Sequence, residues 1–307
     1  MENWRKSPIV FMFTLLPPAL WLTAFFVLPL SLLWLFSFGE KSGITGIDIT
    51  WTLANYARAL EPLYLGIFLK SLWIAGATAL ICLIIGLPVA LAISFASTRT
   101  RPWLLLLIIL PFWTNLLIRT YALIAVLRGS GHVNSVLGWL WQLPDGLLAM
   151  IGLGGHHLMG AQFTPLEILY TDGAVVIGLI YVHLPFMVLP LYAALNSMDR
   201  SLIEASLDLG AGHVRTFFFI VIPLALPGII SGVILTFIPA LGSYLTPDLL
   251  GGPGSQMIAN VIERQFKAAN DWPFGAALSF LLMYAAFFGL ALRGLADRRA
   301  AQPGGAW

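Results

Sequence analysis

Long apolar stretches dominate this chain and limit the folds that it can adopt. Of its 307 residues, 59% are hydrophobic and only 10% are charged, a composition unlike that of soluble domains. Hydrocarbon offers the backbone no water to bond, so stretches of about 20 apolar residues must cross a membrane as helices. The sequence therefore predicts an all-α membrane protein with six transmembrane helices, approximately at Ile9–Phe36, Gly66–Phe95, Trp103–Leu127, Gly173–Asn196, Leu224–Leu245 and Phe274–Leu295.

The basic residues predict how these helices are oriented. An even number of spans places both termini on one side, where short segments contain Arg5, Lys6, Arg99, Arg101, Arg200, Arg215, Arg293, Arg298 and Arg299. On the other side, longer loops contain Lys41, Arg58, Lys70, Arg119, Arg128, Arg264 and Lys267. Because short cytoplasmic loops are rich in Lys and Arg, we expect both termini in the cytoplasm.

The same pattern predicts the organisation of the chain. We expect a single transmembrane domain over residues 1–307, with a core at about 66–295, a cytoplasmic loop at 199–223 and a long periplasmic loop at 128–172. The first apolar stretch is too long for the core of a signal peptide and lacks a cleavage site, so it is interpreted as a retained helix.

The loop at 199–223 has the pattern of a folded helix–turn–helix. Residues 201–204 read Ser-Leu-Ile-Glu, which predicts a capping box between Ser201 and Glu204. Gly210 and Gly212 are expected to end this first helix, because glycine accepts the left-handed conformation that follows a helix. A second helical segment is expected from Val214 to Ile222, next to Pro223. Such a structure at a membrane surface indicates a binding surface for another protein.

Other motifs predict details of packing. Prolines within or near the spans are expected to kink them, at Pro88, Pro111, Pro185, Pro190, Pro227 and Pro239. Gly228 and Gly232 form a GxxxG pattern that allows close approach of a second helix. The segment Val133–Trp141 is expected to be an amphipathic helix on the membrane surface, with Trp139 and Trp141 at headgroup depth.

Several kinds of chemistry are not indicated. The chain has no Gly-x-x-x-x-Gly-Lys-Ser/Thr motif for nucleotide phosphates, and its net charge of +2 does not favour nucleic acid. His156 and His157 are adjacent without further ligand spacing, so we expect no metal site and no cofactor. His183 is expected to be a hydrogen-bonded structural histidine, and Cys82 a small hydrophobic residue.

An ion-coupled carrier that acts alone is a rival interpretation. Such carriers bury ionisable groups along their path. No carboxylate occurs between Glu61 and Asp145, although two predicted spans lie there. The sequence also shows no nucleophile with a partner base, as a membrane-embedded enzyme would need, so no catalytic residue is assigned.

The 199–223 loop resembles the coupling loop of the permease subunits of ABC importers. The resemblance rests on the spacing of Glu204, Ala205, Ser206, Gly210, Ile220 and Pro223. Ser206 stands where alanine is usual and Ile222 where leucine is usual, and both keep the size and character of the position. The resemblance implies a type I ABC importer permease fold in which this loop contacts an ATPase subunit.

Further segments resemble the spermidine/putrescine importer permeases, in particular the first permease subunit. They are Asn55-Tyr56, Pro62 to Tyr64, Pro111 to Asn115 with Ile118-Arg119, Leu184 to Pro190, Asp248 to Gly252 and Asp271 to Phe274. This implies a multi-pass protein of the bacterial inner membrane that imports polyamines from the periplasm. The implied partners are a second permease, two ATPase subunits and a periplasmic binding protein. The stretch 143–163 is longer than in typical members.

The cargo path is predicted from residue types. Aromatic faces and carboxylates suit a polycation, so Trp113, Asn115, Tyr121 and Tyr181 are expected along the path, with Asp248 and Asp271 at its mouth. Trp113 is equally consistent with an interfacial anchor, and the two acids with ordinary loop solvation. Putrescine, spermidine and other cationic or opine-like solutes all fit this chemistry.

Overall fold

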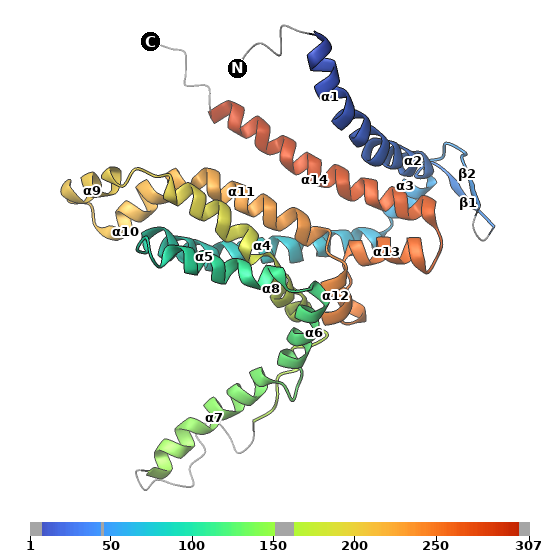
Figure 1. Cartoon of the computed structure of the whole chain (residues 1–307). Coiled ribbons are helices and arrows are strands. Elements are labelled where there is room, and N and C mark those ends of the chain that lie inside the picture. The colour runs from blue at the N-terminus through green and yellow to red at the C-terminus, as the bar shows by residue number, and fades with distance from the viewer. Residues whose placement is uncertain (1–7, 44–45, 151–162, 301–307) are drawn as a thin grey trace. The chain divides into compact units, whose positions relative to one another are not determined.

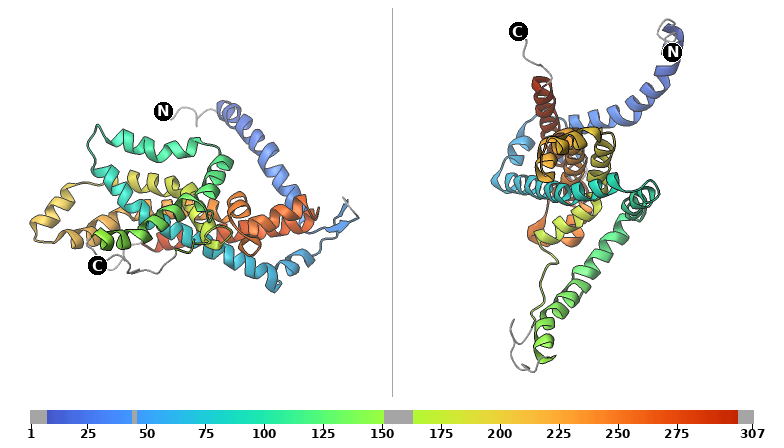
Figure 2. Two further views of the ribbon diagram at one scale, coloured as in Figure 1. Left: turned by 90° about the horizontal axis from the view of Figure 1, so that it is seen from below. Right: turned by 90° about the vertical axis from the view of Figure 1, so that its left-hand side faces the viewer.

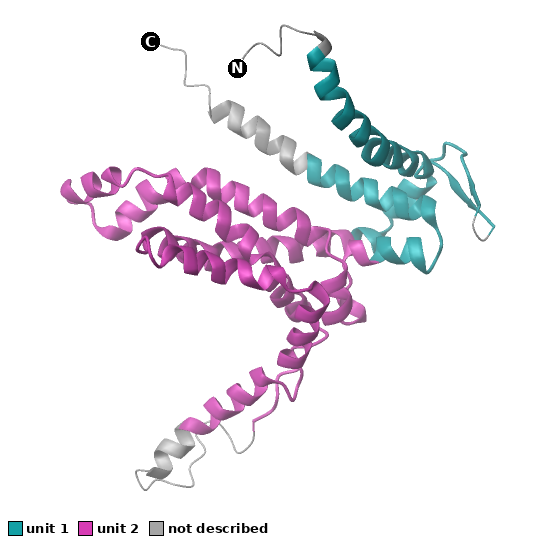
Figure 3. Ribbon diagram, in the orientation of Figure 1, with its two compact units in different colours: residues 1–66, 261–307 teal, residues 67–260 magenta. Residues whose placement is uncertain are grey.

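The computed structural model describes residues 8–43, 46–150 and 163–300, which are almost entirely helical. The chain divides into two compact units, Met1–Gly66 with Val261–Trp307 and Ile67–Asn260 (Figure 3). The helix labels used below are those of Figure 1.

Unit 1 is made of segments from both ends of the chain. Its described elements are α1 (Pro8–Leu22), the π-helical turn η2 (Thr23–Val27), α2 (Leu28–Phe36), β1 (Glu40–Ser42), β2 (Gly46–Asp48), α3 (Ala54–Ala59), most of α13 (Ile258–Lys267) and α14 (Trp272–Ala300). The strands form an antiparallel hairpin in which Lys41 pairs with Ile47. Helix α14 packs against α2 and α3, and the Trp34 indole donates to the Tyr284 hydroxyl at 3.1 Å.

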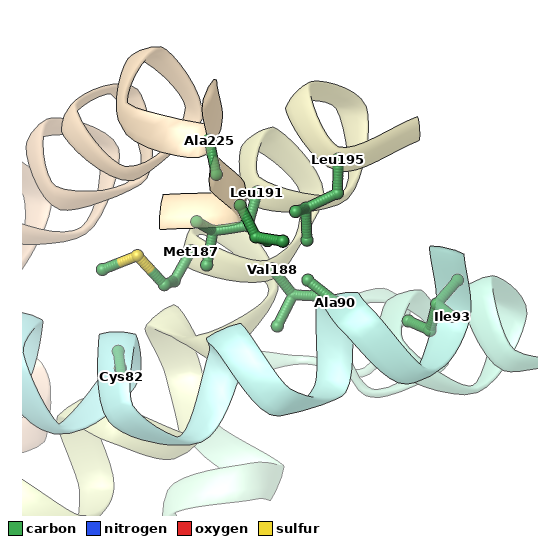
Figure 4. Packing of buried hydrophobic residues seen from close by; sticks show 9 residues of the cluster. Cys82, Ala90, Ile93, Met187, Val188, Leu191, Leu195 and Ala225 are labelled. Carbon is green, nitrogen blue, oxygen red and sulfur yellow. The ribbon is translucent and has the colours of Figure 1, made fainter. Parts of the chain in front are cut away.

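Unit 2 contains the long apolar helices of the bundle. Its elements are α4 (Pro62–Phe95), α5 (Arg101–Ile109), η3 (Leu110–Trp113), α6 (Leu116–Leu127), α7 (His132–Met150), α8 (Asp172–Asn196), α9 (Ser201–Asp208), α10 (His213–Thr216), η4 (Phe217–Val221), α11 (Ile222–Leu241), α12 (Leu245–Leu250) and η5 (Pro253–Ser255). Figure 4 shows the centre of this core, where Met187, Val188 and Leu191 of α8 lie between α4 and α11.

The close approach of α8 and α11 confirms the packing role of the GxxxG pattern. A Cβ atom added to Gly228 would lie 2.5 Å from the Cβ of Ala194 and 2.8 Å from the Pro190 carbonyl oxygen. One added to Gly232 would lie 2.7 Å from the Met187 sulfur. Only glycine lets these two backbones come so close, so the pair is held by dispersion contacts along the helices.

His183 and Cys82 occupy the interior as expected. The His183 ring is 5% exposed, and its Nδ1 lies 2.8 Å from the Leu179 carbonyl oxygen. Cys82 is fully buried in the apolar cluster between α4 and α8.

The helices match the predicted spans only in part. Among the described residues, four helices are long and apolar enough to cross a membrane: Val10–Phe36, Pro62–Phe95, Asp172–Asn196 and His213–Leu241. The helix that contains most of the predicted fifth span runs from His213 to Leu241, so it includes the second helical segment predicted for the 199–223 loop. The last apolar helix is described as such over Trp272–Phe287. The count of six spans and the cytoplasmic position of the termini remain predictions.

The third predicted span is not one straight helix. The segments Arg101–Trp113 and Leu116–Leu143 meet at an angle of 95°. Pro111 lacks an N–H, and Thr114 is extended with a ψ of 147°, so the helical ladder ends there. Asn115 then starts a new helix, because its side-chain oxygen accepts from the Leu117 N–H at 2.8 Å.

Several basic residues that were assigned to outer loops lie inside helices, and two of these helices, α4 and α6, are apolar. Lys70 is part of α4 and forms a 2.8 Å ion pair with Asp172. Arg119 is part of α6, where it is only 8% exposed, and its Nε has no hydrogen-bond partner in the described part of the chain. A guanidinium group exposed to hydrocarbon costs free energy, so Arg119 lies in the packed interior of the protein. It is therefore no guide to which side of the membrane the neighbouring loops face.

The predicted 128–172 loop is partly structured. The helix expected at Val133–Trp141 is present and longer, as α7. Trp141 is half-buried, and its ring centroid lies 6.0 Å from that of Phe163. The headgroup depth of Trp139 and Trp141 remains a prediction. Much of the extended 143–163 stretch, residues 151–162 with His156 and His157, lies outside the described residues.

Candidate functional site

Helices α9 and α10 form a compact hairpin whose turn depends on Gly210. This residue has a φ of +82°, as the sequence predicts. The Gly210 N–H donates to the Leu207 carbonyl at 2.9 Å, and the Ala211 N–H to the Ser206 carbonyl at 3.1 Å. These two bonds make the Schellman arrangement, which satisfies the last carbonyls of α9. Gly212 has a φ of −71°, so the turn requires a left-handed residue only at Gly210.

The predicted capping box is wrong. Ser201 is already helical, and the Glu204 N–H donates to the Arg200 carbonyl at 3.2 Å. The cap comes from Asp199, whose carboxylate accepts from the Ser201 N–H at 3.0 Å. Hydrogen bonds from the backbone and side chain of Ser201 lower the pKa of Asp199. The helix starts one residue early because a carboxylate is available to satisfy its first N–H.

A hydroxyl pair joins the two arms of the hairpin. The Oγ of Ser206 on α9 lies 2.9 Å from the Oγ1 of Thr216 on α10. Thr216 is only 4% exposed, so this bond is shielded from water and holds the arms at a set distance. The sequence analysis did not single out Thr216, because its partner is ten residues away across a turn.

Arg200 attaches the base of the hairpin to the end of α4, and Arg101 of α5 binds the same end of α4. Arg200 donates to the Ser94 carbonyl at 2.9 Å, and Arg101 donates to the same carbonyl at 3.0 Å. Arg101 also donates to the Asn196 side-chain oxygen at 2.9 Å. Carbonyls in the last turn of a helix lack helical partners and lie at the negative end of its dipole, so guanidinium groups bind them well.

The predicted coupling residues lie along one continuous section of the chain. Glu204 and Ala205 are exposed on α9, and Ile220 and Pro223 follow on η4 and α11. Ile203 packs inward against the α4–α8–α11 core. In contrast, Leu209 is 88% exposed and Val214 71% exposed, so the tip of the hairpin presents apolar side chains to its surroundings.

Most of the predicted path residues lie in unit 2. Trp113 and Asn115 stand on either side of the bend, Tyr121 lies on α6, and Tyr181 on α8. All four are exposed in the isolated chain. Asn115 also caps α6, which the sequence analysis did not anticipate. Asp248 lies in the first turn of α12.

Asp271 belongs to unit 1 and has a basic partner of its own. Its carboxylate forms a 2.9 Å ion pair with Arg58 and accepts from the Phe274 N–H at 3.2 Å. The Arg58 guanidinium carbon lies 3.9 Å from the Phe274 ring centroid. Burial lowers the pKa of Arg58, but hydrogen bonds to Asp271 and Tyr64 outweigh that effect and leave it raised. This arrangement gives Asp271 a structural role as ion-pair partner and cap of α14.

Comparison with known protein families identifies the chain. Residues 83–302 match the family described as the binding-protein-dependent transport system inner membrane component. The chain belongs to this family. Its permease fold and inner-membrane location follow, as the sequence predicted, and its transport depends on a binding protein.

The relatives are named as permeases rather than enzymes. The chain is 40% identical over 282 residues to the spermidine/putrescine permease PotB of Salmonella typhimurium strain SL1344, covering 92% of this chain and 91% of the relative. It is 42% identical to PotB of Escherichia coli K12 over 262 residues, with 85% and 88% covered. The likeness to PotB of Haemophilus influenzae is 39% over 259 residues, covering 84% of each chain.

Solved structures support the fold. A chain of a bacterial ABC transporter that imports alginate superposes with a TM-score of 0.70 at 17% identity, covering 98% of this chain and 99% of that one. The same kind of transporter bound to a periplasmic protein carrying an alginate pentasaccharide gives a TM-score of 0.69, with 99% of this chain and 98% of that one covered. At this identity the likeness concerns the permease fold alone.

Proposed function

We propose that this chain is one permease subunit of an ATP-driven importer that moves spermidine or putrescine from the periplasm to the cytoplasm. The observation that carries the proposal is the 40% identity to a spermidine/putrescine permease over nearly the full length of both chains. The other members of the complex would be a second permease, two ATPase subunits and a periplasmic binding protein.

The hairpin is the proposed contact with an ATPase. Its apolar tip, with Leu209 at 88% exposed, suits insertion into a groove of a partner, because an exposed apolar patch marks a protein interface. The helix that starts at His213 runs on to Leu241. A displacement of the hairpin would therefore move α11 and, through the glycine contacts, α8.

The rigidity of the hairpin supports this role. The Schellman bonds and the hydroxyl pair of Ser206 with Thr216 restrict motion within the hairpin, and the bond from Arg200 to the Ser94 carbonyl restricts motion between the hairpin and the bundle. A structure that transmits movement has to move as a rigid body. Tightly packed elements do so, because they shift between discrete positions and do not deform continuously.

The cargo path is proposed to run past the exposed aromatic residues Trp113, Tyr121 and Tyr181, with Asp248 at the mouth. Aromatic faces attract amines without holding them tightly, which suits passage after release from a binding protein. Asp271 is a weaker candidate for cargo contact, because Arg58 already neutralises it. Replacing Asp248 by Asn is expected to raise the KM for spermidine and leave binding-protein-stimulated ATPase activity intact.

The function is tested by uptake in a bacterium that lacks its own polyamine importers. The chain is expressed with its partner permease, ATPase and binding protein, and accumulation of labelled spermidine and putrescine is measured. Uptake should require this chain and an active ATPase, and should continue when an uncoupler is added while ATP is maintained. Omission of the chain and a catalytically inactive ATPase are the controls.

Two outcomes separate the alternatives. Uptake that survives ATP depletion but collapses with the uncoupler would support an ion-coupled carrier and contradict the proposal. ATP-dependent activity without polyamine uptake would assign another cargo, and a thermal-shift screen of the binding protein against other cationic and opine-like solutes would then identify it.

A further inference from the structure

Helix α7 and the returning segment 163–169 form an arm that leaves the bundle of unit 2. Asn134, only 4% exposed, holds the base of this arm. Its Nδ2 donates to the Leu166 carbonyl at 3.0 Å, and its Oδ1 accepts from the Leu166 N–H at 2.7 Å. The paired bonds act like one rung of a β-ladder between α7 and the returning chain. The α7 arm is therefore held together by specific hydrogen bonds at its base.

One face of α7 packs against the returning segment. Gly138 lies so close that an added Cβ would be 3.3 Å from the Phe163 ring. The Trp141 ring centroid is 6.0 Å from that of Phe163. Residues 134, 138 and 141 recur at three- and four-residue spacing, so they share one side of the helix.

The opposite face is apolar and exposed. Its side chains are Val136 at 55%, Trp139 at 61%, Leu140 at 46% and Leu143 at 37% exposed. Their spacing of three, four and seven residues puts them in one stripe about half a turn from the packed face. The polar residues Ser135 and Gln142 lie between the two faces. The α7 arm thus has an apolar stripe that nothing in this chain's described residues covers.

The direction of α7 favours lipid as the occupant. The helix does not extend beyond the end of the bundle from which it starts. Figure 1 and the left view of Figure 2 show it running obliquely back beside the bundle, toward the end that carries α9 and α10. The right view of Figure 2 shows it standing away from the bundle sideways. The stripe therefore lies at the depth of the long apolar helices, where lipid surrounds the protein.

The lack of charged residues along α7 also favours lipid as the occupant of the stripe. No Asp, Glu, Lys or Arg occurs from residue 129 to residue 143, whereas contacts with a water-soluble protein usually have a polar rim. The segment Leu116–Leu143, which contains α6 and the first part of α7, leaves the preceding apolar helix at an angle of 95°. Indole rings such as that of Trp139 also prefer the membrane interface.

We propose that the α7 arm is inserted in the lipid bilayer beside the bundle, with Val136, Trp139, Leu140 and Leu143 in contact with lipid chains. This goes beyond the transport function and does not depend on the identity of the cargo. Because the stripe carries no charge, insertion is driven by apolar burial, and it is expected to be equal in neutral and anionic bilayers.

Site-directed spin labelling tests the proposal in the complete importer. The chain has a single cysteine, Cys82, so a Cys82→Ala background accepts one new cysteine at a time. Nitroxides are placed at Val136, Trp139, Leu140 and Leu143, with matched controls on the same helix at Ser135 and Gln142. The complex is reconstituted in nanodiscs of phosphatidylcholine, with or without phosphatidylglycerol. Collision with oxygen, which enters lipid, is compared with collision with a water-soluble nickel chelate.

The expected result is a difference around the helix. Stripe positions should collide with oxygen more than with nickel in both lipid compositions, and Ser135 and Gln142, which lie between the two faces, should show a smaller excess of oxygen collision. High nickel collision along the stripe would place the arm in water and overturn the proposal. Protection of the stripe from both reagents, or only after addition of the binding protein, would mean that a protein covers it, which also overturns the proposal. Accessibility without helical periodicity counts against it as well.

A second measurement needs no cysteine. Brominated lipids quench tryptophan fluorescence only by contact, so Trp139→Phe should remove part of the quenchable emission, and Trp141→Phe should remove less. Equal losses from the two variants, or no loss from Trp139→Phe, would contradict insertion of the stripe.

Discussion

The α9–α10 hairpin and the α7 arm both leave the bundle of unit 2, but they are attached to it differently. The hairpin is bonded to the bundle at its base through Arg200 and the carbonyl of Ser94, and its second arm continues as a membrane-length helix. The arm of α7 is bonded mainly to its own returning segment through Asn134. This difference in attachment supports the proposals that the hairpin transmits movement to the bundle and that the arm contacts lipid. The predictions below test that contrast.

The largest effect is expected at the turn of the hairpin. Gly210→Val forces a β-branched residue to a φ of +82°, a strain of about 1–3 kcal/mol. No atom lies within 4 Å of a Cβ at Gly210 or at Gly212, so the backbone angle is the only difference between the two sites. Gly210→Val should abolish most transport while the protein remains in the membrane.

Gly212→Val is the matched control, because it introduces the same side chain at a φ of −71°, which residues other than glycine adopt readily. It should transport like the wild type. The measurement is uptake normalised to the amount of complex in the membrane, together with coupled ATPase activity. Wild-type transport by Gly210→Val would show that the hairpin turn does not matter to coupling and would remove the contrast with the arm.

A smaller effect is expected from the hydroxyl pair. Thr216→Val removes the hydrogen bond to the Ser206 hydroxyl, which is only half-buried, so the loss is about 0.5–1.5 kcal/mol. Coupled ATPase activity should fall severalfold. The double variant Ser206→Ala with Thr216→Val removes both hydroxyls and should recover part of the activity. Additive losses in this cycle would show that the two hydroxyls do not act as a pair.

Removing the hydrogen bonds at the base of the α7 arm should loosen the arm and leave the hairpin unchanged. Asn134→Ala removes both hydrogen bonds to the Leu166 backbone, each worth about 0.5–1.5 kcal/mol. Hydrogen exchange should rise in α7 and in residues 163–169 but not in α9 and α10. ATPase coupling should change less than in Thr216→Val. Equal loss of coupling from the two variants would mean that the arm and the hairpin serve the same function.

The smallest effect is expected from Asp199. Hydrogen bonds from Ser201 lower its pKa, so its cap is fully present above its ordinary pKa of 3.8 and is lost only as the pH falls through the lowered value. Coupling should therefore show no dependence on this residue's titration between pH 5 and 8. Asp199→Asn should be close to wild type, since the amide oxygen can also accept. A pH-dependent difference between Asp199→Asn and wild type in this range would contradict the assignment.

Local features of this protein could be predicted from sequence alone. The left-handed residue at Gly210 follows from the conformational freedom of glycine, and the contact at Gly228 and Gly232 from the absence of side chains. The apolar stretches determined that the chain crosses a membrane. These features depend on a few neighbouring residues, so their physical cause is visible in a short window.

Tertiary structure decided the contacts between distant residues. Arg58 and Asp271 are 213 residues apart, and Arg200 and Ser94 are 106 apart, so nothing local to either partner identifies the other. The 95° bend after Trp113 and the outward turn of Trp139, with Trp141 packed inward, likewise depend on which neighbours each helix meets. A sequence window specifies backbone preferences, but only the folded chain specifies which groups come within bonding distance.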